Sequence, residues 1–194
     1  MPKVTEAYRE ARRDEIAQAA LRCLARNGFA NTSMADIIAE SGSSAGAIYS
    51  HFAGKADIAR HVAQIVMDSK ATELIGYAGG LGRPIAPAET IRFLLDTLGR
   101  EGVSKSMLVQ LWAEATVDPD IHTVMSEAVG QLRHAFEVTV RPWLVANGMP
   151  ADEPSVQRAA TAMLTLSQGF IANTALFGDR DPADYLATAG MLLR

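Results

Sequence analysis

The sequence predicts an all-α protein, and three observations carry this prediction. Apolar residues recur at helical spacing, as they do at Ile16, Ala19, Ala20, Cys23 and Leu24. Residues that typically begin or end helices separate these apolar runs. No stretch alternates apolar and polar residues in the way that a half-buried strand requires.

Helix-start and helix-stop residues set the expected boundaries. Ser33 fits an N-cap, Asp36 can close a capping box with it, and Gly42 fits the end of that helix. Ser44 can cap a third, very short helix. The expected helices cover residues 8–27, 33–42, 45–51, 55–75, 87–100, 104–117, 119–146 and 155–177, and a last one runs from 182 to the end. Residues 76–84 are expected to form a loop, and Pro142 is expected to kink or break its helix.

Composition excludes several classes of protein. Hydrophobic residues make up 48% of the chain and charged residues 21%, as in ordinary globular proteins. The single cysteine, Cys23, excludes an intrachain disulfide framework. The polar amino terminus is unlike a signal peptide, and no apolar run reaches the roughly 18 residues of a membrane span. We therefore expect a cytoplasmic protein without a membrane partner.

Charge is divided unevenly along the chain. The net charge of −4 argues against an indiscriminate nucleic-acid binder. Residues 1–60, however, hold 8 lysines and arginines against 7 acidic residues, whereas the remaining residues hold 10 against 15. This asymmetry permits a polyanionic partner for the first 60 residues.

Residues 8–51 have the organisation of a helix-turn-helix, because the third expected helix is short and follows a Gly-Ser turn. The small residues of "SSAGA", at 43–47, would let this helix lie deep in the major groove of a DNA duplex. Donors suited to phosphate contacts stand around it. These donors are Ser44, Tyr49, His51 and Lys55, while Ser33 and Lys55 also stand at helix starts that favour phosphate.

Two local alternatives stay open. The stretch "SGSSAG" could be a plain turn with no partner. Three arginines of the first helix, Arg9, Arg12 and Arg13, could contact phosphate or could form a solvated face with the acidic residues among them.

We expect no catalytic residue, metal site or cofactor. The four histidines form no HxxxH or HExxH pair, and Cys23 has no CxxC partner. The sequence also lacks the GxSxG, Walker A and GxGxxG motifs.

The pattern "I..AA...L...GF.NTSM.DI...SG.S.GAIY.HF..K.D", from Ile16 to Asp57, resembles the DNA-binding domain of the TetR family of transcriptional regulators. The stretch "LVQLWAEATVDPDI" is similar to the ligand domain of AcrR-type members. The resemblance implies a three-helix DNA-binding domain, here residues 1–54, followed by a helical ligand-binding and dimerisation domain, here residues 55–194.

The resemblance also implies roles for single residues. Ile37, Ile48 and Phe52 would hold the helices together. Phosphate would be contacted by Ser33, Tyr49, His51 and Lys55, and base edges would be faced by Ser43, Ser44, Ala45, Gly46 and Ala47. The family often has a basic residue or proline where this sequence has Ala45, so readout would depend more on thymine methyl groups and DNA shape.

The resulting hypothesis is a homodimeric repressor that an apolar or amphipathic small molecule releases from a palindromic operator. Residues 121–140 and 155–177 are apolar over so much of their circumference that they predict buried helices or a subunit interface. The candidate effector-binding residues are Met67, Phe93, Met107, Trp112, Met125, Phe170 and Asn173. The alternatives are a regulator of the same fold that responds to a protein partner, and a helical carrier or enzyme without a DNA function.

Overall fold

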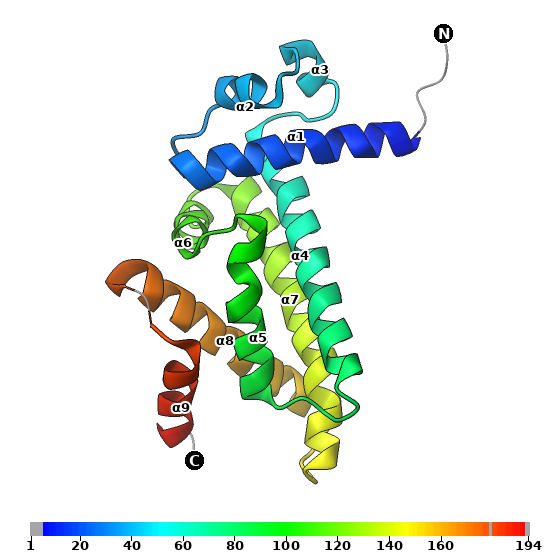
Figure 1. The fold of residues 1–194 in the computed structure, drawn as a ribbon, viewed down its shortest axis with the longest axis vertical. Coiled ribbons are helices and arrows are strands. Elements are labelled where there is room, and N and C mark those ends of the chain that lie inside the picture. Colours follow the sequence, from blue (N-terminus) through cyan, green and yellow to red (C-terminus); the bar gives the residue numbers. More distant parts are fainter. Residues whose placement is uncertain (1–5, 179, 193–194) are drawn as a thin grey trace. The chain divides into compact units, whose positions relative to one another are not determined.

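The computed structural model describes residues 6–178 and 180–192, and all regular structure within them is helical (Figure 1). The all-α prediction is therefore confirmed. The elements are α1 Glu6–Asn27, α2 Met34–Ser41, α3 Ala45–Tyr49, α4 Lys55–Gly80, α5 Pro87–Thr97, the 3₁₀ turn η1 Leu98–Glu101, α6 Lys105–Glu114, α7 Pro119–Ala146, α8 Glu153–Phe177 and α9 Pro182–Leu192. The charged amino terminus at residues 1–5 and the last two residues of the expected final helix lie outside the described residues.

Two helices continue past a point where the sequence suggested an interruption, and the other helix ends differ from their expected positions by up to three residues. Helix α4 continues to Gly80, so the loop expected from residue 76 begins only at Leu81. The Tyr77 ring stacks on Phe93 of α5 with 4.2 Å between ring centres, which anchors the last turns of α4 despite the cost of about 1 kcal/mol per helical glycine. Helix α7 likewise runs through Pro142, because the buried Val140 and Leu144 hold it on both sides.

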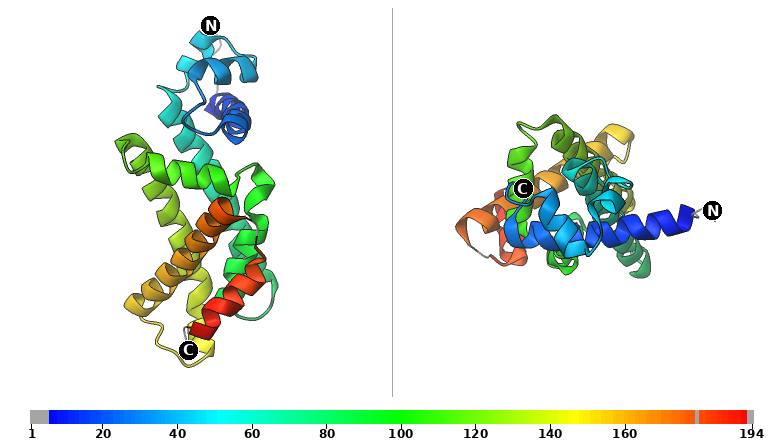
Figure 2. Two further views of the ribbon diagram at one scale, coloured as in Figure 1. Left: turned by 90° about the vertical axis from the view of Figure 1, so that its left-hand side faces the viewer. Right: turned by 90° about the horizontal axis from the view of Figure 1, so that it is seen from above.

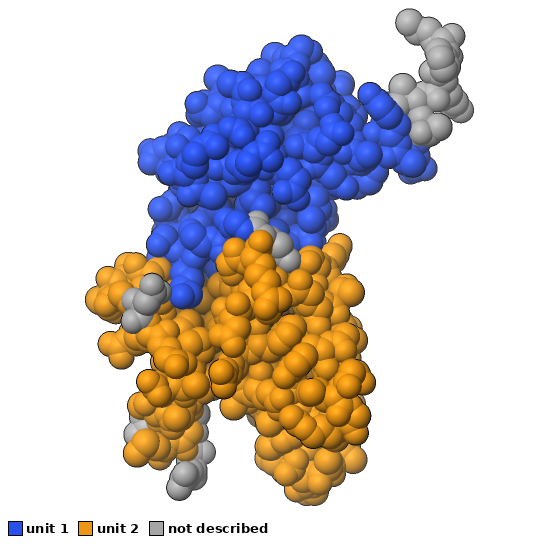
Figure 3. Space-filling view, in the orientation of Figure 1, with its two compact units in different colours: residues 1–66, 102–127 blue, residues 67–101, 128–194 orange. Residues whose placement is uncertain are grey.

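The chain forms two compact units, each built from two segments of sequence (Figure 3). The first unit contains residues 1–66 and 102–127, and the second contains residues 67–101 and 128–194. The functional boundary predicted at residue 54 is a different division, which these units do not test.

The first unit is organised around α1, with α2 packed against it (Figure 1). Ile37, Ile48 and Phe52, the three expected core residues, are all buried. Residues 102–127 join this core because Gly102 lies against Leu21 and because Gln110 approaches Gly28. Gly28 has φ +75°, a backbone conformation that favours glycine, and a Cβ there would displace the Gln110 amide that lies against it.

In the second unit, α8 and α9 pack on α5 (Figure 2). Phe136 of α7 and Phe170 of α8 are fully buried, so much of the predicted apolar surface of these two helices lies within the protomer. The core also contains a charged residue. Lys70 of α4 is 2% exposed, and its Nζ donates to the Thr97 carbonyl at 3.0 Å and to Glu73 Oε2 at 3.2 Å. None of the described helices is both long enough and apolar enough to cross a membrane.

The start of α2 shows how local sequence fixes this fold. Ser33 accepts a hydrogen bond from the Asp36 N–H, and Asp36 accepts one from the Ser33 N–H, so the predicted capping box is confirmed. Near the end of α2, Glu40 binds Arg26 at 2.5 Å and Arg22 at 2.7 Å, which joins α2 to α1.

The Glu40 pairs predict a pH dependence of stability. Hydrogen bonds from Arg26 and then Arg22 hold the pKa of the Glu40 carboxyl below its ordinary value of 4.5. A carboxyl whose pKa is lower in the folded state stabilises the fold above its ordinary pKa and loses that effect as the pH falls through the lowered one. We expect Glu40→Gln to unfold at a lower temperature than the wild type at neutral pH. The difference should shrink below pH 4.5 and with added salt, because the pairs are exposed. A difference that grows with acid would contradict the assignment.

Candidate nucleic-acid interface

The candidate interface is the turn between α2 and α3 together with α3 itself. Gly42, with φ +63°, ends α2 in the left-handed conformation and turns the chain. Ser44 then caps α3 by accepting a hydrogen bond from the Ala47 N–H at 3.2 Å. Both helices lie on one side of α1 (Figure 1), so the expected helix-turn-helix is present.

The outer face of α3 is small and open. Ala45 and Gly46 are exposed, and a Cβ at Gly46 would meet no atom within 4 Å. Tyr49 is 55% exposed, whereas Ile48 alone of the five helix residues is buried. Another molecule can therefore approach the α3 backbone closely, and the Tyr49 side chain is accessible to it.

Ser33 and Lys55, two of the predicted phosphate donors, have partners within the protein. The Ser33 hydroxyl donates to Asp36 Oδ2 at 2.6 Å, and the hydrogen bonds from Ser33 hold the pKa of Asp36 below its ordinary value. Lys55 Nζ donates to the Phe29 carbonyl at 2.9 Å and lies 4.3 Å from the centre of the Phe29 ring. The structure therefore gives both side chains partners within the protein, and their contacts with phosphate stay predictions.

Two arginines of α1 reach this site in a way that sequence reasoning missed. Arg12 Nη2 donates to the Ser43 hydroxyl at 2.6 Å, and Arg13 Nη1 donates to the His51 carbonyl at 2.7 Å. The sequence offered a solvated face or a phosphate contact for both. No spacing rule would have found partners that lie 31 and 38 residues away.

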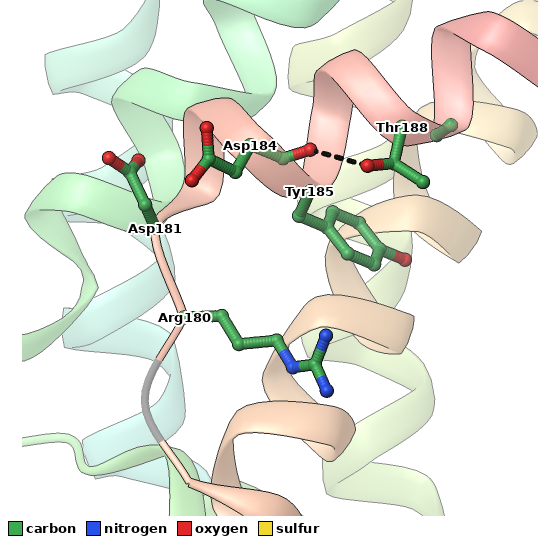
Figure 4. Close-up of a pocket in the computed structure, with 6 residues that line it drawn as sticks. Arg180, Asp181, Asp184, Tyr185 and Thr188 are labelled. Carbon is green, nitrogen blue, oxygen red and sulfur yellow. Dashed lines mark hydrogen bonds between the residues drawn. The ribbon is translucent and has the colours of Figure 1, made fainter.

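Two cavities of about 460 Å³ are described, both in the second unit. Arg180, Asp184 and Tyr185 line the first, at the start of α9 (Figure 4). The second is mainly apolar and lies among the end of α4, the loop after it and the last part of α7. Arg83 at this cavity is held by two hydrogen bonds to Glu89.

Neither cavity contains any of the predicted effector-binding residues. Met107, Trp112 and Met125 belong to the first unit, whereas Met67, Phe93, Phe170 and Asn173 belong to the second. Phe170 is fully buried with its ring against Tyr185, Phe93 stacks on Tyr77, and Asn173 is exposed. The effector site therefore stays a prediction.

One cluster of metal-ligand type involves side chains far apart in sequence. Ligand atoms of Glu10, Asp14 and His61 lie within 4.8 Å of one another. His61 Nε2 is 2.9 Å from Asp14 Oδ1, and this hydrogen bond between α1 and α4 explains the approach without an ion.

Comparisons with known proteins show what this site is similar to. Residues 16–62 match the model of the bacterial regulatory proteins of the tetR family. A region of 67 residues is 36% identical to the uncharacterized HTH-type transcriptional regulator YfiR of Bacillus subtilis (strain 168). The match covers 34% of this chain and spans about a third, 33%, of that relative.

Solved structures share the fold over nearly the whole chain. GusR of Salmonella enterica superposes with a TM-score of 0.65 at 19% identity, covering 98% of both chains. A protein described as a TetR-family transcriptional regulator of Rhodococcus sp. gives a TM-score of 0.74 at 18% identity, covering 95% of this chain and 100% of its own. A protein described as a transcriptional regulator of Saccharomonospora viridis, in complex with choline, gives 0.67 at 24% identity and covers 95% of both chains.

Proposed function

We propose that this chain, which belongs to the TetR family of bacterial regulatory proteins, is a DNA-binding transcriptional regulator that reads operator sequence through α3. The observation that carries the proposal is the capped, five-residue α3 with its small exposed face, inside the segment that matches the family model. A helix that presents small residues lets its backbone approach base edges, while neighbouring donors fix the register on phosphate.

The regulator is proposed to act as a homodimer on a palindromic operator. Exposed apolar side chains in the second unit support a subunit interface, among them Val138 and Val145 of α7 and Leu176 and Phe177 of α8. In such a dimer the two α3 helices would enter half-sites separated by roughly 34–36 Å, one turn of B-DNA. Light scattering on the full chain should give twice the protomer mass.

The proposed control is release of the operator by an apolar or amphipathic small molecule in the cytoplasm, which makes the protein a repressor. A ligand can shift DNA affinity only through its different affinities for the bound and free conformations. The choline complex of the Saccharomonospora viridis protein supports small-molecule binding by this fold. The proposal assigns no catalytic step to the chain.

The test is selection of DNA from a random-sequence pool by the full chain, followed by anisotropy titrations at several salt concentrations. We expect the selected duplex to be bound about a thousandfold or more tightly than a scrambled duplex of equal composition. Equal affinity for both duplexes would overturn the proposal.

The exposed Tyr49 hydroxyl and the inward Lys55 ammonium give different predictions. Tyr49→Phe should weaken binding to selected and scrambled duplexes alike without changing the salt dependence, because a neutral donor displaces no counterion. Lys55→Ala should lower the slope of log affinity against log salt by about 1 if its ammonium contacts phosphate. If Lys55→Ala leaves the salt slope unchanged, Lys55 does not contact phosphate and its role is the contact with Phe29. If Tyr49→Phe changes the base preference, the phosphate contact proposed for Tyr49 is wrong.

A further inference from the structure

Two neighbouring arginines of α1 hold the two ends of α3. Arg12 donates to the hydroxyl of Ser43, the residue directly before the N-cap Ser44. Arg13 donates to the carbonyl of His51, the residue directly after the C-cap Ser50. The segment from 43 to 51 is therefore fixed to one face of α1 at both of its ends.

Helix α3 needs such external support because it is very short. A helix of five residues closes too few backbone hydrogen bonds to be stable alone. Its own core contact is limited to Ile48, the single buried residue in it. The orientation of its exposed face thus depends on what holds the flanking residues.

The Arg13 guanidinium is itself held in place from a second side. Its central carbon lies 4.4 Å from the centre of the Phe52 ring, and Phe52 is 1% exposed. The centre of the His61 ring, on α4, is 5.7 Å from the centre of the Phe52 ring, and His61 is hydrogen-bonded back to Asp14 of α1. A planar guanidinium stacks flat on a ring and donates from its edge in a fixed direction, whereas a lysine ammonium is a point charge on a flexible stem and does not fix that geometry.

We propose that Arg12 and Arg13 are positioning residues for DNA readout, which act by fixing α3 on α1 and not by contacting phosphate. The inference rests on the proposed DNA-binding function and extends it to residues outside α2 and α3. Arg12 also pairs with Glu15, so its guanidinium, like that of Arg13, is directed to partners within the protein. Losing either contact lets α3 change its orientation, which weakens base readout more than it weakens attraction to the phosphate backbone.

The experiment compares Arg13→Gln, Arg13→Lys and Arg12→Gln with the matched control Arg9→Gln in the full chain. Arg9 lies on the same helix and is exposed, and its guanidinium makes no hydrogen bond or ion pair with another described residue. Its replacement removes the same charge from α1 without touching α3. Hydrogen exchange over residues 43–52 is the first measurement, because it needs no DNA, and thermal unfolding checks that each variant is folded.

We expect Arg13→Gln and Arg12→Gln to accelerate exchange in α3 about tenfold or more, in line with the loss of a charge-assisted hydrogen bond. Arg13→Lys should recover little of the protection, and Arg9→Gln should exchange like the wild type. Against the duplex selected by the wild type, Arg13→Gln should lower the ratio of specific to scrambled affinity about tenfold more than Arg9→Gln does, with the same salt slope as that control.

The outcomes separate this inference from the proposed function. If Arg13→Gln and Arg12→Gln match Arg9→Gln in both exchange and affinity ratio, the inference is wrong while wild-type selectivity still supports a regulator. A loss of affinity equal for both duplexes, with a lower salt slope, would make these arginines phosphate contacts and also overturn it. If the wild type selects no sequence, the proposed function fails, and the exchange data alone decide whether the arginines fix α3.

Discussion

Replacing Phe52 with alanine should destabilise the first unit by about 3–5 kcal/mol and remove specific DNA binding. The Phe52 ring is buried beneath the Arg13 guanidinium and beside the His61 ring, so its loss leaves a cavity where α1, α4 and the end of α3 meet. Urea unfolding followed by circular dichroism measures the loss in stability.

Phe52→Leu is the matched control, because it keeps most of the buried volume and should cost less than about 2 kcal/mol. It removes the ring under Arg13, so the ratio of specific to scrambled DNA affinity should fall although most of the free energy of unfolding is kept. If Phe52→Ala unfolded within about 1 kcal/mol of the wild type, the ring would not be part of the core that the structure describes.

The second large effect is expected for Lys70→Glu, which should destabilise the second unit by roughly 3 kcal/mol or more. The variant carboxylate would face the Thr97 carbonyl and Glu73, both of which are acceptors that the lysine now satisfies. Without a donor, a buried charge keeps its desolvation penalty. Thermal unfolding of the full chain measures the change.

Lys70→Met separates the charge from the packing of the long side chain. It fills similar space without a charge, and exchange of a buried charge for an apolar side chain is often close to neutral. We therefore expect Lys70→Met to unfold well above Lys70→Glu. Equal destabilisation by both variants would show that the ammonium and its hydrogen bonds are required.

Local signals in the sequence were sufficient where the structure is set by neighbouring residues. The capping box of Ser33 and Asp36, the left-handed Gly42 and the Ser44 cap are all present, because each involves atoms within three residues of one another. These signals located the helix-turn-helix correctly.

Predictions were less accurate where tertiary packing competes with propensity. Gly76, Gly79 and Gly80 suggested a loop, yet α4 includes them because Tyr77 stacks on a phenylalanine of another helix. Pro142 suggested a kink or a break because proline lacks the N–H of a helical hydrogen bond, yet α7 continues through it between the buried Val140 and Leu144.

Partners distant in sequence are the part of the site that no pattern could reveal. The Lys55 ammonium donates to a carbonyl 26 residues earlier, a partner that the sequence did not indicate beside the predicted phosphate contact. The predicted effector-binding residues line neither of the two described cavities, and their role stays a prediction. Methionine and aromatic side chains serve a hydrophobic core as well as a binding pocket, and Met107 and Phe170 are buried core residues.

The contact between Gly28 and Gln110 has a consequence for building hybrid regulators. Residues 102–127 belong to the same unit as residues 1–66, and they are held there by Gln110 at Gly28, by Gly102 at Leu21 and by Glu127, which lies 3.9 Å from Arg60. A chimera that joins residues 1–54 to the sensing region of another regulator would leave this segment behind and expose Leu21 to water. A chimera that transplants residues 1–66 and 102–127 together would keep all the contacts of the first unit.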